Sequence, residues 1–96
     1  MTDDIHTTQR LRLLNDKSHD QTVCLEPWGT HLTLYPDDAL DVVVESPRPG
    51  TLEVATGDDI LTVFAWEGAT FAVYRDGDLL SQSRVAVPPI PNPVNA

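Results

Sequence analysis

Residues 60–66 decide the fold class and read Ile60-Leu61-Thr62-Val63-Phe64-Ala65-Trp66. Side chains of a strand alternate between two faces. One face would therefore carry Ile60, Thr62, Phe64 and Trp66, and the other Leu61, Val63 and Ala65. Both sets are largely apolar, which is typical of a strand covered on both sides. We expect this strand to lie either in the centre of a sandwich or at a subunit interface.

The neighbouring segments also have a period of two. Leu40, Val42 and Val44 alternate with Asp41, Val43 and Glu45, and residues 32–35, 52–55 and 70–75 behave alike. Clusters of glycine, proline and aspartate separate them at roughly 8–12 residues, the spacing of short strands joined by turns. Asp76-Gly77 suits a tight hairpin, and residues 10–14 an edge strand with Leu11 and Leu13 inward. We predict an all-β fold, a single-domain antiparallel β-sandwich or small jelly-roll-like barrel of about seven to eight short strands.

The 96 residues fit one domain, which we place at residues 9–87. Residues 1–8 are expected to form a flexible N-terminus. Residues 88–96 contain four of the eight prolines and are expected to form an extended tail. This tail is either loose or an arm that packs on a partner subunit through Ile90 and Val94.

Acidic residues outnumber basic ones by 15 to 6, giving a net charge of −9. Such a chain repels phosphate backbones and anionic headgroups, so we expect neither nucleic-acid nor membrane binding. The acids are either a solvated surface or a face for a basic protein partner. The single cysteine, Cys24, forms no internal disulfide, and the first residues lack a signal peptide's apolar region. The expected location is cytoplasmic.

No set of residues forms a recognisable reaction centre. The histidines His6, His19 and His31 show no His-x-His spacing, and His31 with Glu26 would supply only two metal ligands. Serine-nucleophile and phosphate-loop motifs are absent from the sequence, and Cys24 has no evident base. We therefore expect no metal, no cofactor and no catalytic residue, and a binding protein rather than an enzyme.

The most distinctive segment is Leu25-Glu26-Pro27-Trp28-Gly29. Pro27 favours extended geometry at Glu26, and Gly29 permits a sharp reversal, so Trp28 is held at a corner. Its indole either caps the core or lines a ligand pocket or interface, and Trp66 has the same two interpretations. Our candidates for ligand or interface contact are Trp28, Glu26, His31, Trp66, Phe64 and Tyr74.

This segment, followed by Leu34-Tyr35-Pro36 and Leu40-Asp41-Val42-Val43, resembles a group of small bacterial proteins with a Leu-Glu-Pro-Trp-Gly element and no assigned activity. The rhythm of strand, proline turn and strand is also similar to cupin-like β-barrels, whose metal motif this chain lacks. The expected function is a non-enzymatic, homodimeric interaction module that binds a protein or small ligand. The alternatives are a cupin-like enzyme or metal binder using His31 and Glu26, and an acidic antitoxin or immunity-type neutraliser of a basic partner.

Overall fold

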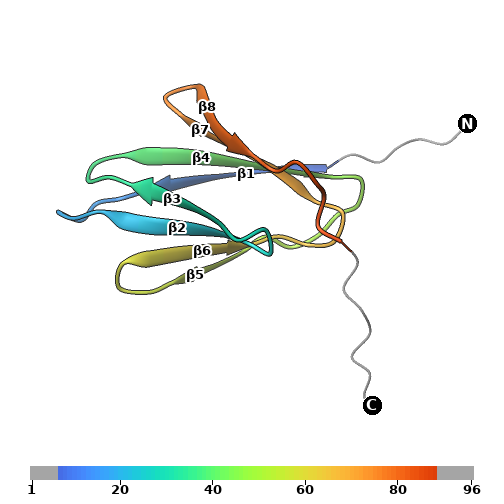
Figure 1. Cartoon of the computed structure of the whole chain (residues 1–96), viewed down its shortest axis with the longest axis horizontal. Helices are drawn as coiled ribbons and strands as arrows, with labels where there is room; N and C mark the ends of the chain where they lie inside the picture. Colours follow the sequence, from blue (N-terminus) through green and yellow to red (C-terminus); the bar gives the residue numbers. More distant parts are fainter. Residues whose placement is uncertain (1–6, 89–96) are drawn as a thin grey trace, which may run out of the picture.

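The computed structural model describes residues 7–88, which form eight β-strands and no helix (Figure 1). The strands are β1 (Thr7–Leu14), β2 (Gln21–Glu26), β3 (Thr30–Leu34), β4 (Ala39–Ser46), β5 (Glu53–Thr56), β6 (Ile60–Phe64), β7 (Thr70–Arg75) and β8 (Asp78–Gln82). They make two four-stranded sheets packed face to face. The predicted all-β sandwich is confirmed.

Sheet 1 has the order β1-β4-β7-β8, and sheet 2 has the order β3-β2-β6-β5. Every pair in sheet 1 is antiparallel, as are β2–β3 and β5–β6. The pair β2–β6 is parallel, so the prediction of purely antiparallel pairing is wrong there. The chain leaves sheet 2 after β3 and passes through β4 of sheet 1. It returns to sheet 2 as β5 and reverses into β6, which lies beside β2 and runs in the same direction.

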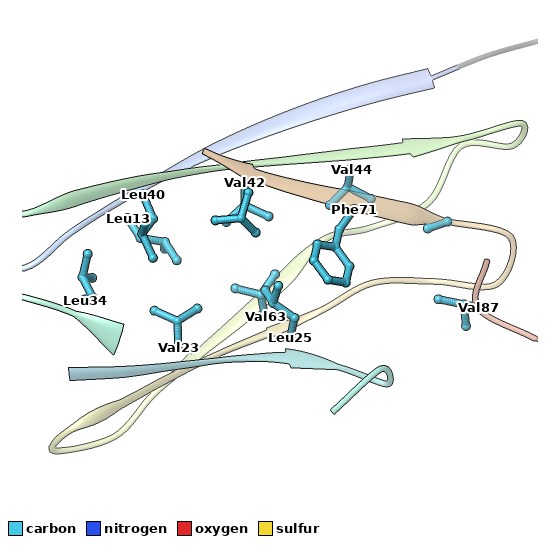
Figure 2. Packing of buried hydrophobic residues seen from close by; sticks show 12 residues of the cluster. Leu13, Val23, Leu25, Leu34, Leu40, Val42, Val44, Val63, Phe71 and Val87 are labelled. Carbon is cyan, nitrogen blue, oxygen red and sulfur yellow. The ribbon is translucent and has the colours of Figure 1, made fainter. Parts of the chain in front are cut away.

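The core lies between the sheets, and side chains from each sheet point toward the other (Figure 2). Sheet 1 contributes Leu13, Leu40, Val42, Val44, Phe71 and Val73, and sheet 2 contributes Val23, Leu25, Leu34 and Val63. Ala69 from the β6–β7 connection and Val87 from the chain after β8 complete the cluster. Leu13, Leu40, Val42 and Val44 are inward positions that the period of two predicts, whereas Ala69 and Val87 lie outside the strands. The edge-strand prediction is also confirmed, because β1 borders sheet 1 with Leu13 buried and Leu11 half-buried against the core.

Two turns owe their shape to residues with positive φ. Asp76 and Gly77 have φ of 52° and 84°, as the predicted tight hairpin requires. In the β3–β4 turn Pro36 is followed by Asp37 at φ 61°, and the Asp38 amide donates to the Tyr35 carbonyl at 3.0 Å. Proline in the first central position and positive φ in the second are typical of a type II turn.

The first strand begins earlier than the predicted domain boundary. Strand β1 begins at Thr7, so Thr7 and Thr8 belong to the sheet rather than to the expected flexible segment of residues 1–8. Residues 1–6 and 89–96 lie outside the described residues, and with them most of the predicted tail, including Ile90 and Val94. Residues 7–88 hold no helix of the length and apolarity that crossing a membrane requires.

Candidate functional site

The outer face of sheet 2 brings together three of the six candidate residues. Its central row runs across the four strands from His31 through Cys24 and Thr62 to Ala55. In the next row Phe64 lies between Glu26 and Glu53, on neighbouring strands. Glu26, His31 and Phe64 therefore share this face, although they come from three different strands.

This face exposes apolar side chains from a strand in the interior of its sheet. Strand β6 has neighbours on both sides, and Val63 on its inner face is buried. On its outer face Ile60 is 47% exposed and Phe64 is 41% exposed. The strand predicted to be covered on both faces is therefore covered on one. Its other face is open in the single chain.

The described residues of this face do not assemble a metal site. Among residues 7–88, no group of three or more histidine, cysteine, aspartate or glutamate side chains is placed to hold a metal ion. Cys24 and His31 lie directly opposite each other on β2 and β3, and His31 is exposed.

Trp28 lies in the connection between β2 and β3 and packs against the core. The peptide bond between Glu26 and Pro27 is cis, Gly29 has φ 75°, and the Gly29 amide donates to the Leu25 carbonyl at 2.9 Å. This corner turns the indole edge-on to Phe71, with ring centroids 4.7 Å apart. Its Nε1–H donates to the Val85 carbonyl at 3.2 Å. The packing agrees with the predicted structural cap.

Trp66 is also held by its surroundings. Its Nε1–H is shared between the Ser46 hydroxyl at 3.1 Å and the Arg48 carbonyl at 3.0 Å. Gly50 lies against the indole so closely that a Cβ at this position would overlap the ring. With its polar group occupied and its face covered, Trp66 closes the β4–β5 loop over the core rather than offering a free aromatic surface.

Tyr74 lies on the opposite side of the molecule, on the outer face of sheet 1. There a trough crosses β4 and β7, with one hollow of about 410 Å³ and an adjoining one of about 270 Å³. Val43 and Ala72, adjacent in the sheet, form its floor, and Tyr74 borders both hollows. Arg10 and Arg12 from β1 line one end, and Gln82 from β8 lines the other.

Sequence reasoning missed the trough except for Tyr74. Val43 is an apolar residue at an outward position between Asp41 and Glu45, and this exception to the alternation was the available signal. Its solvent-facing side chain is only 9% exposed, because longer neighbours surround it. The pairing that brings Arg10 beside Val43 is not visible in the sequence.

The six predicted candidates therefore do not form one site: three share the outer face of sheet 2, Tyr74 lies in the trough, and the two tryptophans are partly buried and pack against the core. Comparison with protein-family models, with curated proteins and with solved structures gave no match to this chain.

Proposed function

We propose that this chain is a non-enzymatic interaction module that works as a homodimer, with the outer face of sheet 2 as its interface. The observation that carries the proposal is the exposure of Ile60 and Phe64 on an interior strand. An apolar face over the centre of a sheet is a common mark of a protein contact. A second copy would give β6 the cover on both sides that its sequence favours.

The chemistry of the face supports a like partner. Its central row of His31, Cys24, Thr62 and Ala55 carries no formal charge when the imidazole is neutral. Cores of protein interfaces are depleted of charged residues. A neutral centre can meet its own copy across a two-fold axis without like-charge repulsion. Glu26 and Glu53, on either side of Phe64, would then lie toward the rim.

The size of the face predicts a weak dimer. Four strands about 4.8 Å apart and about five residues long at 3.3 Å each give a flat area of roughly 300 Å² per copy. Stable interfaces bury about 800 Å² of accessible surface per partner. Side chains that stand out from the sheet make the accessible area larger than the flat area, but it stays below that value. We therefore expect dissociation in the micromolar range, with the monomer dominant on dilution.

Sedimentation equilibrium over a range of concentrations tests this proposal. Wild-type protein should pass from monomer to dimer, and Phe64→Lys and Ile60→Lys should each shift the dissociation constant upward by about tenfold or more. The matched control is Leu79→Lys, because Leu79 is 50% exposed on an edge strand of the other sheet. A wild-type protein that stays monomeric at millimolar concentration refutes the proposal, as does a dimer that only the control disrupts.

A second candidate, the acidic neutraliser of a basic protein, is favoured by the distribution of aspartates. The connections β1–β2, β3–β4, β5–β6 and β7–β8 lie at one end of the sandwich, on the left in Figure 1. They carry Asp16, Asp20, Asp37, Asp38, Asp58, Asp59 and Asp76, and Asp78 begins β8 directly after the last of them. Among these acids, Asp38 pairs with Arg75 and Asp59 contacts His19.

Salt dependence tests this second candidate. A lysine-rich peptide should bind at low ionic strength and lose affinity steeply as salt rises. The double substitution Asp58→Asn and Asp59→Asn should weaken it, whereas Glu53→Gln, on the outer face of sheet 2, should not. Binding that is insensitive to salt or to the aspartates would exclude an electrostatic partner site at this end.

A further inference from the structure

The trough on the outer face of sheet 1 is separate from both surfaces assigned above. Its larger hollow of about 410 Å³ lies within the range of about 300–1,000 Å³ that small-molecule sites occupy. The floor is apolar because Val43 and Ala72 form it, and their short side chains leave a hollow between longer neighbours, with Tyr74 at its border. These features suit a flat apolar body that lies on the sheet and contacts the phenol ring.

Some of the charged side chains around the trough have ion-pair partners, and one has none in the described part of the chain. Arg12 Nε donates to Asp41 Oδ1 at 3.0 Å, and these two groups neutralise each other. Glu45 already has a partner of its own. Within residues 7–88, the Arg10 side chain makes no hydrogen bond and no ion pair. The guanidinium of Arg10 is therefore the charged group left available at this end of the trough.

We propose that this trough binds a small aromatic carboxylate, whose ring lies over Val43 and Ala72 beside Tyr74 and whose carboxylate pairs with Arg10. The planar guanidinium matches a carboxylate through two parallel hydrogen bonds. The ligand carries one negative charge, because a chain with a net charge of −9 repels polyanions. Gln82 at the far end contributes an amide to a polar group on the opposite edge of the ring.

Titrations of isotope-labelled protein with benzoate and 2-naphthoate, followed by amide chemical shifts, test this proposal. The shifts should centre on β4 and β7 around Val43, Ala72 and Tyr74. The uncharged amides of the same two acids should bind at least fivefold more weakly, since they lose the charged pair. Shifts that are absent at millimolar ligand, that centre elsewhere, or that are equal for acids and amides would overturn the proposal.

Two variants separate the charge from the shape of the trough. Arg10→Gln should weaken binding of the acid by about fivefold or more and leave binding of the amide unchanged. Ala72→Leu should weaken both by filling the floor. The control Lys17→Gln removes the same charge from the exposed β1–β2 loop and should change neither. If Lys17→Gln weakens binding as much as Arg10→Gln, the effect is one of net charge and the site is refuted.

Ligand binding in the trough can be tested separately from dimer formation. The trough and the dimer face lie on opposite sheets. Phe64→Lys should therefore leave the titration with 2-naphthoate unchanged. A ligand that binds only to the wild-type dimer and not to this monomeric variant would place the binding site elsewhere.

Discussion

Replacing Asn15 by alanine should destabilise the fold more than any exposed polar substitution. Asn15 follows β1 and is fully buried. Its Nδ2 donates to the His19 carbonyl at 2.8 Å and the Leu34 carbonyl at 3.0 Å, while its Oδ1 accepts from the Lys17 amide at 2.9 Å. Its backbone also bonds to Asp37 and Asp38 in the β3–β4 turn. One side chain thus joins the ends of three strands.

The magnitude follows from the three side-chain bonds. Each contributes about 1 kcal/mol net, and the buried Leu34 carbonyl left without its donor adds a desolvation cost. We expect Asn15→Ala to lower the free energy of unfolding by about 3–4 kcal/mol, a large share of the roughly 5–10 kcal/mol of a small domain. The melting temperature should fall by more than about 12 °C.

Urea denaturation followed by circular dichroism measures this loss. The isosteric Asn15→Asp separates hydrogen bonding from packing. It retains the acceptor for the Lys17 amide, but it places a carboxylate oxygen, which cannot donate, against the carbonyls of His19 and Leu34. At neutral pH it should be at least as destabilising as alanine. The exposed neighbour supplies the control, and Asp16→Ala should change stability by less than about 0.5 kcal/mol. If Asn15→Ala costs under about 1 kcal/mol, or if the aspartate variant is the milder, the reasoning is refuted.

Two further predictions concern the tryptophans. Trp28→Ala removes the edge-on contact with Phe71 and the bond to the Val85 carbonyl, and should cost about 2–3 kcal/mol in a thermal or urea melt; unchanged stability would show that Trp28 is not a cap. Gly50→Ala forces a Cβ into the Trp66 ring and should cost about 1–3 kcal/mol while moving tryptophan emission to longer wavelength. A stable variant with unaltered emission would contradict the close approach.

Local features of the fold could be predicted because neighbouring residues encode them. The alternation in β4 places Leu40, Val42 and Val44 inward, and Asp76-Gly77 supplies the positive φ that the β7–β8 turn requires. The parallel pairing of β2 with β6 could not be predicted in this way. A period of two shows which face a residue takes, but it carries no information on which distant strand lies alongside.

The candidate surfaces show the same division. Alternation indicates that Glu26 points away from Leu25, yet only the register reveals that Glu26 lies beside Phe64 and that Cys24 lies opposite His31. At Trp66, a large aromatic at a strand end, the sequence left both a core cap and a binding surface open. Its indole N–H donates hydrogen bonds to the Ser46 hydroxyl and the Arg48 carbonyl, and no sequence pattern predicts these bonds.

The two outer faces differ because of the lengths of the side chains around each apolar residue. Arginines and a tyrosine surround Val43 on sheet 1, which leaves it covered at the bottom of a hollow. On sheet 2 the row between Ile60 and Phe64 carries threonine, cysteine and alanine, and both apolar side chains stay exposed although Glu26 and Glu53 flank Phe64. A hollow suits a small molecule, and a protruding apolar strip suits a broad surface. Since the faces lie on opposite sheets, a dimer formed through sheet 2 leaves both troughs open and should take up two ligands per dimer without cooperativity.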